Sequence, residues 1–126
     1  MADVIHLRRA LLVAVGGAIG TAGRLGIGLL LPDAGGFPIS IITVNVLGAF
    51  LIGLLAARLP SSSERRIFLA TGVLGGFTTY STFAVGTVQL WGQSPMLAAI
   101  SALLTLVVGL AAAAAGLRIG MPRRSA

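Results

Sequence analysis

The stretch Gly72–Phe83, GVLGGFTTYSTF, gathers residues whose chemistry suits an ion. Its glycines and hydroxyl residues stand in an otherwise apolar run, where hydrocarbon penalises irregular backbone and unpaired hydroxyls because no water is present. Gly75, Gly76, Thr78 and Thr79 combine poor helix formers with side chains that compete for backbone hydrogen bonds, so we expect a helix to break here. A break frees carbonyl oxygens, which a cation such as Na⁺ would satisfy. The alternative is a bent, continuous helix whose hydroxyls bond back to its own carbonyls.

The second half of this stretch has groups that suit an anion. Tyr80 and Phe83 are three residues apart and therefore point to nearly the same side of a resumed helix. The edge of an aromatic ring is positive, so two such rings can line an anion path, although aromatics at this spacing also serve as packing. Thr79, Ser81 and Thr82 supply hydroxyl donors that either face such a path or bond their own backbone.

Two further polar residues lie within apolar segments. Arg24 carries a guanidinium that needs water, an anion or a partner, unless it reaches the membrane interface. Asn45 carries an amide that can donate to an anion or to a neighbouring helix. One cation, one amide, several hydroxyls and no acid inside the apolar segments favour a small anion over a cation as the permeant species.

Several function classes lack the residues they need. The apolar segments contain no Asp, Glu, Lys, His or Cys, so we do not expect an enzyme, and proton-coupled transport is disfavoured. A small multidrug exporter, which is also built from four spans, would require an intramembrane carboxylate that is absent. The glycine-rich GGAIGTAG lacks the strand and the lysine of a phosphate loop, and no domain is available to bind nucleic acid.

The elements that position these residues are membrane helices. The 126 residues are 56% hydrophobic and only 10% charged, which indicates an integral membrane protein surrounded by lipid. We predict an all-α fold in which a single membrane domain, residues 1–126, holds four spans of about 20 residues or more. They cover residues 10–31, 38–57, 66–91 and 95–119, and the third is broken near its middle.

Small residues recur at a spacing that favours close helix packing. Gly16 and Gly20, and likewise Gly72 and Gly76, are four apart, which allows helix backbones to approach closely in lipid. We expect packing to be the main role of Gly16 and Gly20.

The arginines predict one orientation. Four spans put both termini and the middle loop on one side, and that side receives all arginines except Arg24: Arg8, Arg9, Arg58, Arg65, Arg66, Arg118, Arg123 and Arg124. By the positive-inside rule, we expect a multi-pass cell-membrane protein with both termini in the cytoplasm.

These motifs together resemble the CrcB/Fluc family of small fluoride channels. The resemblance covers nearly the whole chain, through GGAIGTAGR, GFPISIITVNVLGAFLIGLL and TGVLGGFTTYSTF. It implies an antiparallel dimer that exports fluoride passively from the cytoplasm and so reduces fluoride toxicity. It also implies a structural Na⁺ at the dimer centre that is not transported. Main-chain carbonyls from the broken third helix hold this ion, and by motif position they belong to Gly75 and Thr78.

The resemblance also implies the residues of the anion path. The family's paired pore phenylalanines fall on Tyr80 and Phe83, and its polar track falls on Ser81 and Thr82. Its second-helix asparagine corresponds to Asn45 and its first-helix arginine to Arg24.

The chain departs from the family pattern in several places. Tyr80 adds a hydroxyl to the first pore ring, Gly86 stands where a glutamate is common, and Leu110 and Ala114 stand where hydroxyl residues are common. An antiparallel homodimer also requires one sequence to insert both ways, whereas the arginines here favour one direction. The alternative is therefore a poorly conducting subunit that works only when paired with an oppositely oriented homologue, as a heterodimer.

Overall fold

The computed structural model describes residues 1–122, and 84% of that range is helical, with no β-strand in it. The expected all-α class is confirmed. Four long segments are each apolar enough to cross a membrane, so the chain is a multi-pass membrane protein. The elements are α1 (Ala2–Leu30), α2 (Ile39–Arg58), a third segment composed of α3 (Glu64–Arg66), the π-helix η1 (Ile67–Leu74), α4 (Gly75–Phe77) and α5 (Tyr80–Gln93), and finally α6 (Pro95–Gly120).

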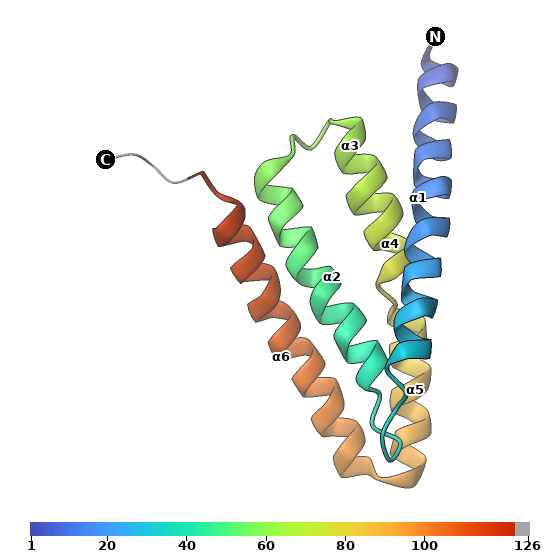
Figure 1. The fold of residues 1–126 in the computed structure, drawn as a ribbon, viewed down its shortest axis with the longest axis vertical. Coiled ribbons are helices and arrows are strands. Elements are labelled where there is room, and N and C mark those ends of the chain that lie inside the picture. The colour runs from blue at the N-terminus through green and yellow to red at the C-terminus, as the bar shows by residue number, and fades with distance from the viewer. Residues whose placement is uncertain (123–126) are drawn as a thin grey trace.

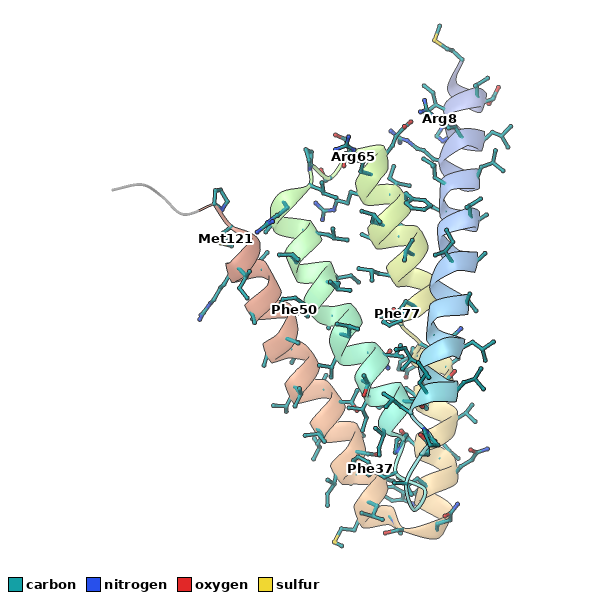
Figure 2. All side chains as sticks on the ribbon, viewed as in Figure 1. Arg8, Phe37, Phe50, Arg65, Phe77 and Met121 are labelled. Atoms are coloured by element: carbon teal, nitrogen blue, oxygen red, sulfur yellow. The ribbon has the colours of Figure 1, made fainter. Side chains whose placement is uncertain are left out.

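The four segments run alternately in opposite directions (Figure 1). The start of α1, the α2–α3 connection and the end of α6 lie at one end, which we call the arginine-rich end. The connections before α2 and before α6 lie at the opposite end. Figure 2 places Arg8 and Arg65 at the arginine-rich end and Phe37 at the opposite end. The helix ends bring Arg9, Arg58, Arg66 and Arg118 to the arginine-rich end as well, whereas Arg123 and Arg124 lie outside the described residues.

The first helix extends beyond its apolar stretch. It begins at Ala2 rather than near residue 10, and its 29 residues give it a length of about 43 Å, more than the hydrocarbon thickness. Its first turns therefore lie in or beyond the interface. There Arg8 Nη2 lies 2.7 Å from Glu64 Oε2, and because both side chains are well exposed this ion pair contributes at most about 1 kcal/mol.

Hydroxyl side chains cap the N-termini of three of the helices. Ser63 Oγ accepts a hydrogen bond from the Arg66 amide at 3.2 Å, and Ser94 Oγ accepts one from the Leu97 amide at 3.3 Å. Thr79 Oγ1 does the same for α5, at 3.1 Å. Each cap satisfies an amide that has no partner within the helix, which fixes where the helix begins.

The helices associate as two close pairs. α1 packs against η1 and α4, and α2 packs against α6. In the first pair, Gly16 and Gly20 lie directly against the backbone of the third segment, as the glycine spacing predicted. In the second pair, Gly53 lies against the Ala113 carbonyl and Gly116 lies against the Phe50 carbonyl. Most large apolar side chains are exposed, which suits a molecule surrounded by lipid or by a partner of similar polarity.

Candidate ion pathway and cation site

The third segment is interrupted at Thr78 and Thr79. Both residues are extended, with φ/ψ of −75°/152° and −145°/118°, and the segment bends by 18°. The predicted break is confirmed. The alternative contributes one feature, because Thr78 Oγ1 bonds back to the Leu74 carbonyl at 2.8 Å. This hydroxyl therefore ends α4 and leaves the next residue free to begin a new helix.

Asn45 bridges the break from α2. Its Oδ1 accepts from the Thr79 amide at 2.8 Å, and its Nδ2 donates to the Thr79 carbonyl at 3.1 Å. A side-chain amide thus pairs with both backbone groups of one residue, at a point where the helix supplies no partner for the Thr79 amide. The sequence left open whether Asn45 meets an anion or another helix, and in this structure it contacts another helix.

The carbonyl oxygens at the break differ in whether a protein group donates a hydrogen bond to them. The Gly76 carbonyl accepts from Thr21 Oγ1 at 3.4 Å. Within residues 1–122, no protein hydrogen bond reaches the carbonyl oxygens of Gly75 and Thr78. Gly75 is also exposed on the surface of the chain. Two neutral oxygens without donors match what a desolvated monovalent cation needs, and in the described range no cluster of acidic or histidine side chains offers a different metal site.

Beyond the break, Thr82 joins Arg24 to a chain of hydroxyls. Arg24 Nη1 donates to Thr82 Oγ1 at 3.4 Å, and Thr79 Oγ1 donates to the same oxygen at 3.0 Å. Because the single proton of Thr79 is used there, Ser81 Oγ, at 3.3 Å, is the donor in its contact with Thr79. Thr82 Oγ1 accepts two hydrogen bonds, so its own proton remains free to donate to a ligand.

These groups line a pocket of about 300 Å³ between α1, α2 and α5. Its polar lining consists of Thr21, Arg24, Ser40, Thr79 and Thr82, and its apolar lining includes Leu25, Ile41 and Val44. A guanidinium and several hydroxyls converge there without any acidic side chain in the lining. We call it the Arg24 pocket, and its charge and donors suit a small anion.

The two aromatic rings lie elsewhere. The ring centroids of Tyr80 and Phe83 are 6.3 Å apart and the planes are tilted by 43°, so the rings share one side as expected. They line an apolar groove of about 560 Å³ against α6, together with Leu106 and Leu110. Tyr80 is 82% exposed. Since successive helical residues point about 100° apart, Thr82 and Phe83 face different sides of α5. One chain therefore brings Arg24, Thr79 and Thr82 together but not with the rings.

Two residues that line the Arg24 pocket were not predicted from the sequence. Thr21 lies one turn before Arg24 on α1, and this spacing of three was the signal that could have found it. Ser40 lies in the first turn of α2, where a serine is ordinarily assigned to the helix start, so the sequence held no signal for its place in a pocket.

Comparison with known proteins supplies independent information. Residues 11–117 match the family described as CrcB-like protein, Camphor Resistance (CrcB). A protein of Agrobacterium fabrum named fluoride-specific ion channel FluC is 47% identical over 116 residues, which cover 86% of this chain and 93% of that protein. Proteins with the same name are 44% identical in Paracoccus denitrificans, over 86% of this chain and 90% of the relative, and 45% identical in Thermus thermophilus, over 90% and 96%.

Proposed function

The chain belongs to the CrcB family, and from this premise we propose that it is a fluoride-specific ion channel of the cell membrane that exports fluoride passively and reduces fluoride toxicity. The names of its relatives support the choice of ion. The observation that carries the proposal is the Arg24 pocket, where a guanidinium and a free hydroxyl proton meet in a lining that contains no acidic side chain. No step in this function requires catalysis.

Fluoride must exchange water for protein donors in order to enter a membrane. Thr82 offers its free proton, and Arg24 offers positive charge together with N–H donors. The hydroxyls of Thr21 and Ser40 lie in the same lining, but their protons are donated to the Gly76 carbonyl and to Asp33. A potential that is negative inside drives an anion outward with about 2.3 kcal/mol per 100 mV, so no other energy source is needed.

For the orientation, we propose that the arginine-rich end faces the cytoplasm, which places both termini there. Six described arginines at this end against none in the connections at the opposite end support this choice. Fluoride then leaves toward the end formed by the connections before α2 and before α6.

We propose that the break holds a structural Na⁺ that is not transported. The free carbonyl oxygens of Gly75 and Thr78 fit such an ion, and the exposure of Gly75 suits a position between two chains. These oxygens accept no hydrogen bond from the protein, and a bound Na⁺ would supply the positive charge that they lack. The break at Thr78 and Thr79 would then stay extended because the ion satisfies the free carbonyl oxygens beside it.

If Na⁺ binds the folded protein, it must stabilise it. We expect the midpoint of thermal unfolding in detergent to fall by several degrees when Na⁺ is replaced by N-methylglucamine at equal ionic strength, because a ligand of the native state adds stability as its concentration rises. The measurement is a melting curve at 0, 10 and 150 mM Na⁺. A melting midpoint that does not depend on Na⁺ would contradict the site.

For the assembly, we propose an antiparallel dimer, in which the partner covers the exposed Tyr80 and the groove beside it. The second candidate is a subunit that conducts only when paired with an oppositely oriented homologue. The one-sided arginines favour this second candidate, because they oppose insertion of the same sequence in both directions.

Fluoride efflux from liposomes tests the function directly. We expect the purified chain, alone or with an oppositely oriented homologue, to release fluoride but not chloride. Conduction by the chain alone supports the homodimer, and conduction only with the homologue supports the paired subunit. Absence of fluoride release in both cases would contradict the proposed channel.

The same assay tests the donor role of Thr82. We expect Thr82→Val to lower the rate about tenfold or more, because loss of one hydrogen bond to a charged ligand costs about 1.5 kcal/mol or more. Thr82→Ser should retain most of the rate. Thr87→Val is the matched control, since the Thr87 hydroxyl only bonds back to the Phe83 carbonyl at 2.8 Å. Equal rates for Thr82→Val and Thr87→Val would contradict the role of Thr82.

A further inference from the structure

A second pocket, of about 310 Å³, adjoins the Arg24 pocket and shares Ile41 and Thr82 with it. We call it the outer pocket. Its lining comes from the connection before α2, from the start of α2 and from one face of α5. Because the connection before α2 lies at the end opposite the arginine-rich end, the outer pocket extends from Thr82 toward that end (Figure 1).

One face of α5 follows the whole outer pocket. Thr82, Gly86, Gln89 and Gln93 are spaced by four, three and four residues, which places them on the same side of the helix, and all four line the outer pocket. Gly86 leaves space in the middle, and the two glutamines add neutral amide donors. An anion leaving Thr82 therefore meets donors without positive charge along this face.

Asp33 brings a negative charge to the same pocket. It is the only acidic residue that the described part of the chain carries at this end, because Asp3 and Glu64 lie at the arginine-rich end. Ser40 Oγ donates to Asp33 Oδ1 at 3.2 Å, and Ser40 itself lines the Arg24 pocket. The hydrogen bond from Ser40 thus holds the Asp33 carboxylate next to the Arg24 pocket.

We propose that Asp33 controls how readily anions pass between the outer pocket and the surrounding water. Its charge repels anions that approach from outside, and it also favours the departure of an anion that has left Arg24. This inference rests on the proposed function, since it assigns Asp33 to the path of the permeant anion. Because Asp33 is exposed, its effect is screened by salt.

The local potential can be measured without any fluoride flux. The chain has no cysteine, so Gln89→Cys places a single thiol in the outer pocket. Cationic and anionic methanethiosulfonate reagents of similar size then report the potential as a ratio of reaction rates. We expect Asp33→Asn to lower the cationic-to-anionic ratio about threefold or more at an ionic strength near 0.01 M, where the Debye length is about 30 Å, and far less at 1 M, where it is about 3 Å. Asp3→Asn, at the other end, should leave the ratio unchanged.

Fluoride flux provides the second arm. At low ionic strength, we expect Asp33→Asn to raise fluoride influx about twofold to fivefold over the unsubstituted chain, with the gain lost in 1 M salt. Ser40→Ala, which releases the carboxylate, should change the thiol ratio in the same direction but less. An unchanged thiol ratio in Asp33→Asn would overturn the proposal, and so would a changed ratio with unchanged influx. If the thiol ratio changes but the unsubstituted chain passes no fluoride under any pairing, the proposed function fails while the charge assignment stands.

Discussion

Gly20→Ala should destabilise the folded protein by about 3 kcal/mol or more, and we expect it to leave little folded protein after extraction from the membrane. A Cβ at Gly20 would overlap the carbonyl oxygen of Val73 and would lie 2.8 Å from the amide nitrogen of Phe77. Both atoms belong to the backbone of the third segment, so no side-chain rotation relieves the clash. The helices must instead move apart, which removes the close contact that holds α1 in place.

Gly26→Ala is the matched control on the same helix. Apart from the neighbouring backbone of α1 itself, no atom lies within 4 Å of a Cβ at this position. Because alanine is the better helix former, we expect this change to be neutral or to stabilise the helix by up to about 1 kcal/mol. Unfolding by sodium dodecyl sulfate, followed by circular dichroism, compares the two variants. If Gly20→Ala and Gly26→Ala unfold at the same detergent fraction, backbone contact at Gly20 does not hold the pair together.

The contrast between these glycines explains which parts of the fold the sequence could predict. Helix spans follow from composition, and the spacing of Gly16 and Gly20 indicated a packing face because close approach in lipid requires small residues. The partner of that face was not predictable. Gly20 meets Val73, more than fifty residues away, and nothing local in the sequence specifies such a contact.

The candidate site shows the same division. A break was predictable because glycines and threonines weaken a helix wherever they gather. The role of Asn45 was left open, since an amide in a membrane needs a partner but does not reveal which one. The rings of Tyr80 and Phe83 and the donor Thr82 were expected along one path because they are adjacent in sequence. Helical geometry turns them to different sides, so within one chain they line separate hollows. The liposome assay, with and without a homologue, tests whether a second chain joins the Arg24 pocket to the apolar groove.

Thr79 links the break to the Arg24 pocket. Its amide and carbonyl pair with Asn45, while its hydroxyl caps α5 and donates to Thr82. The position of the Thr82 proton therefore depends on the position of Thr79, which the hydrogen bonds from Asn45 on α2 fix. Asn45, which does not itself line the Arg24 pocket, thus fixes the geometry within that pocket.

Asn45→Leu removes that support with little change in side-chain volume. It leaves the Thr79 amide without its partner in a part of the molecule that water does not reach freely, which costs about 2–3 kcal/mol, and it removes the donor to the Thr79 carbonyl as well. We expect the unfolding midpoint to fall accordingly. Fluoride efflux should fall by about tenfold or more even in the fraction that stays folded, because Thr79 no longer orients Thr82.

Gln93→Leu separates the loss of stability from the loss of any amide. Gln93 is exposed at the end of α5, where water can replace its hydrogen bonds, so we expect a change in unfolding free energy within about 0.5 kcal/mol. Asn45→Asp retains an acceptor for the Thr79 amide, and it should therefore recover part of the stability. It also brings negative charge close to the Arg24 pocket, and so it should not recover the efflux. Stability that returns without efflux in Asn45→Asp would indicate that the added charge lies close to an anion pathway, whereas stability and efflux that return together would contradict this position of the pathway.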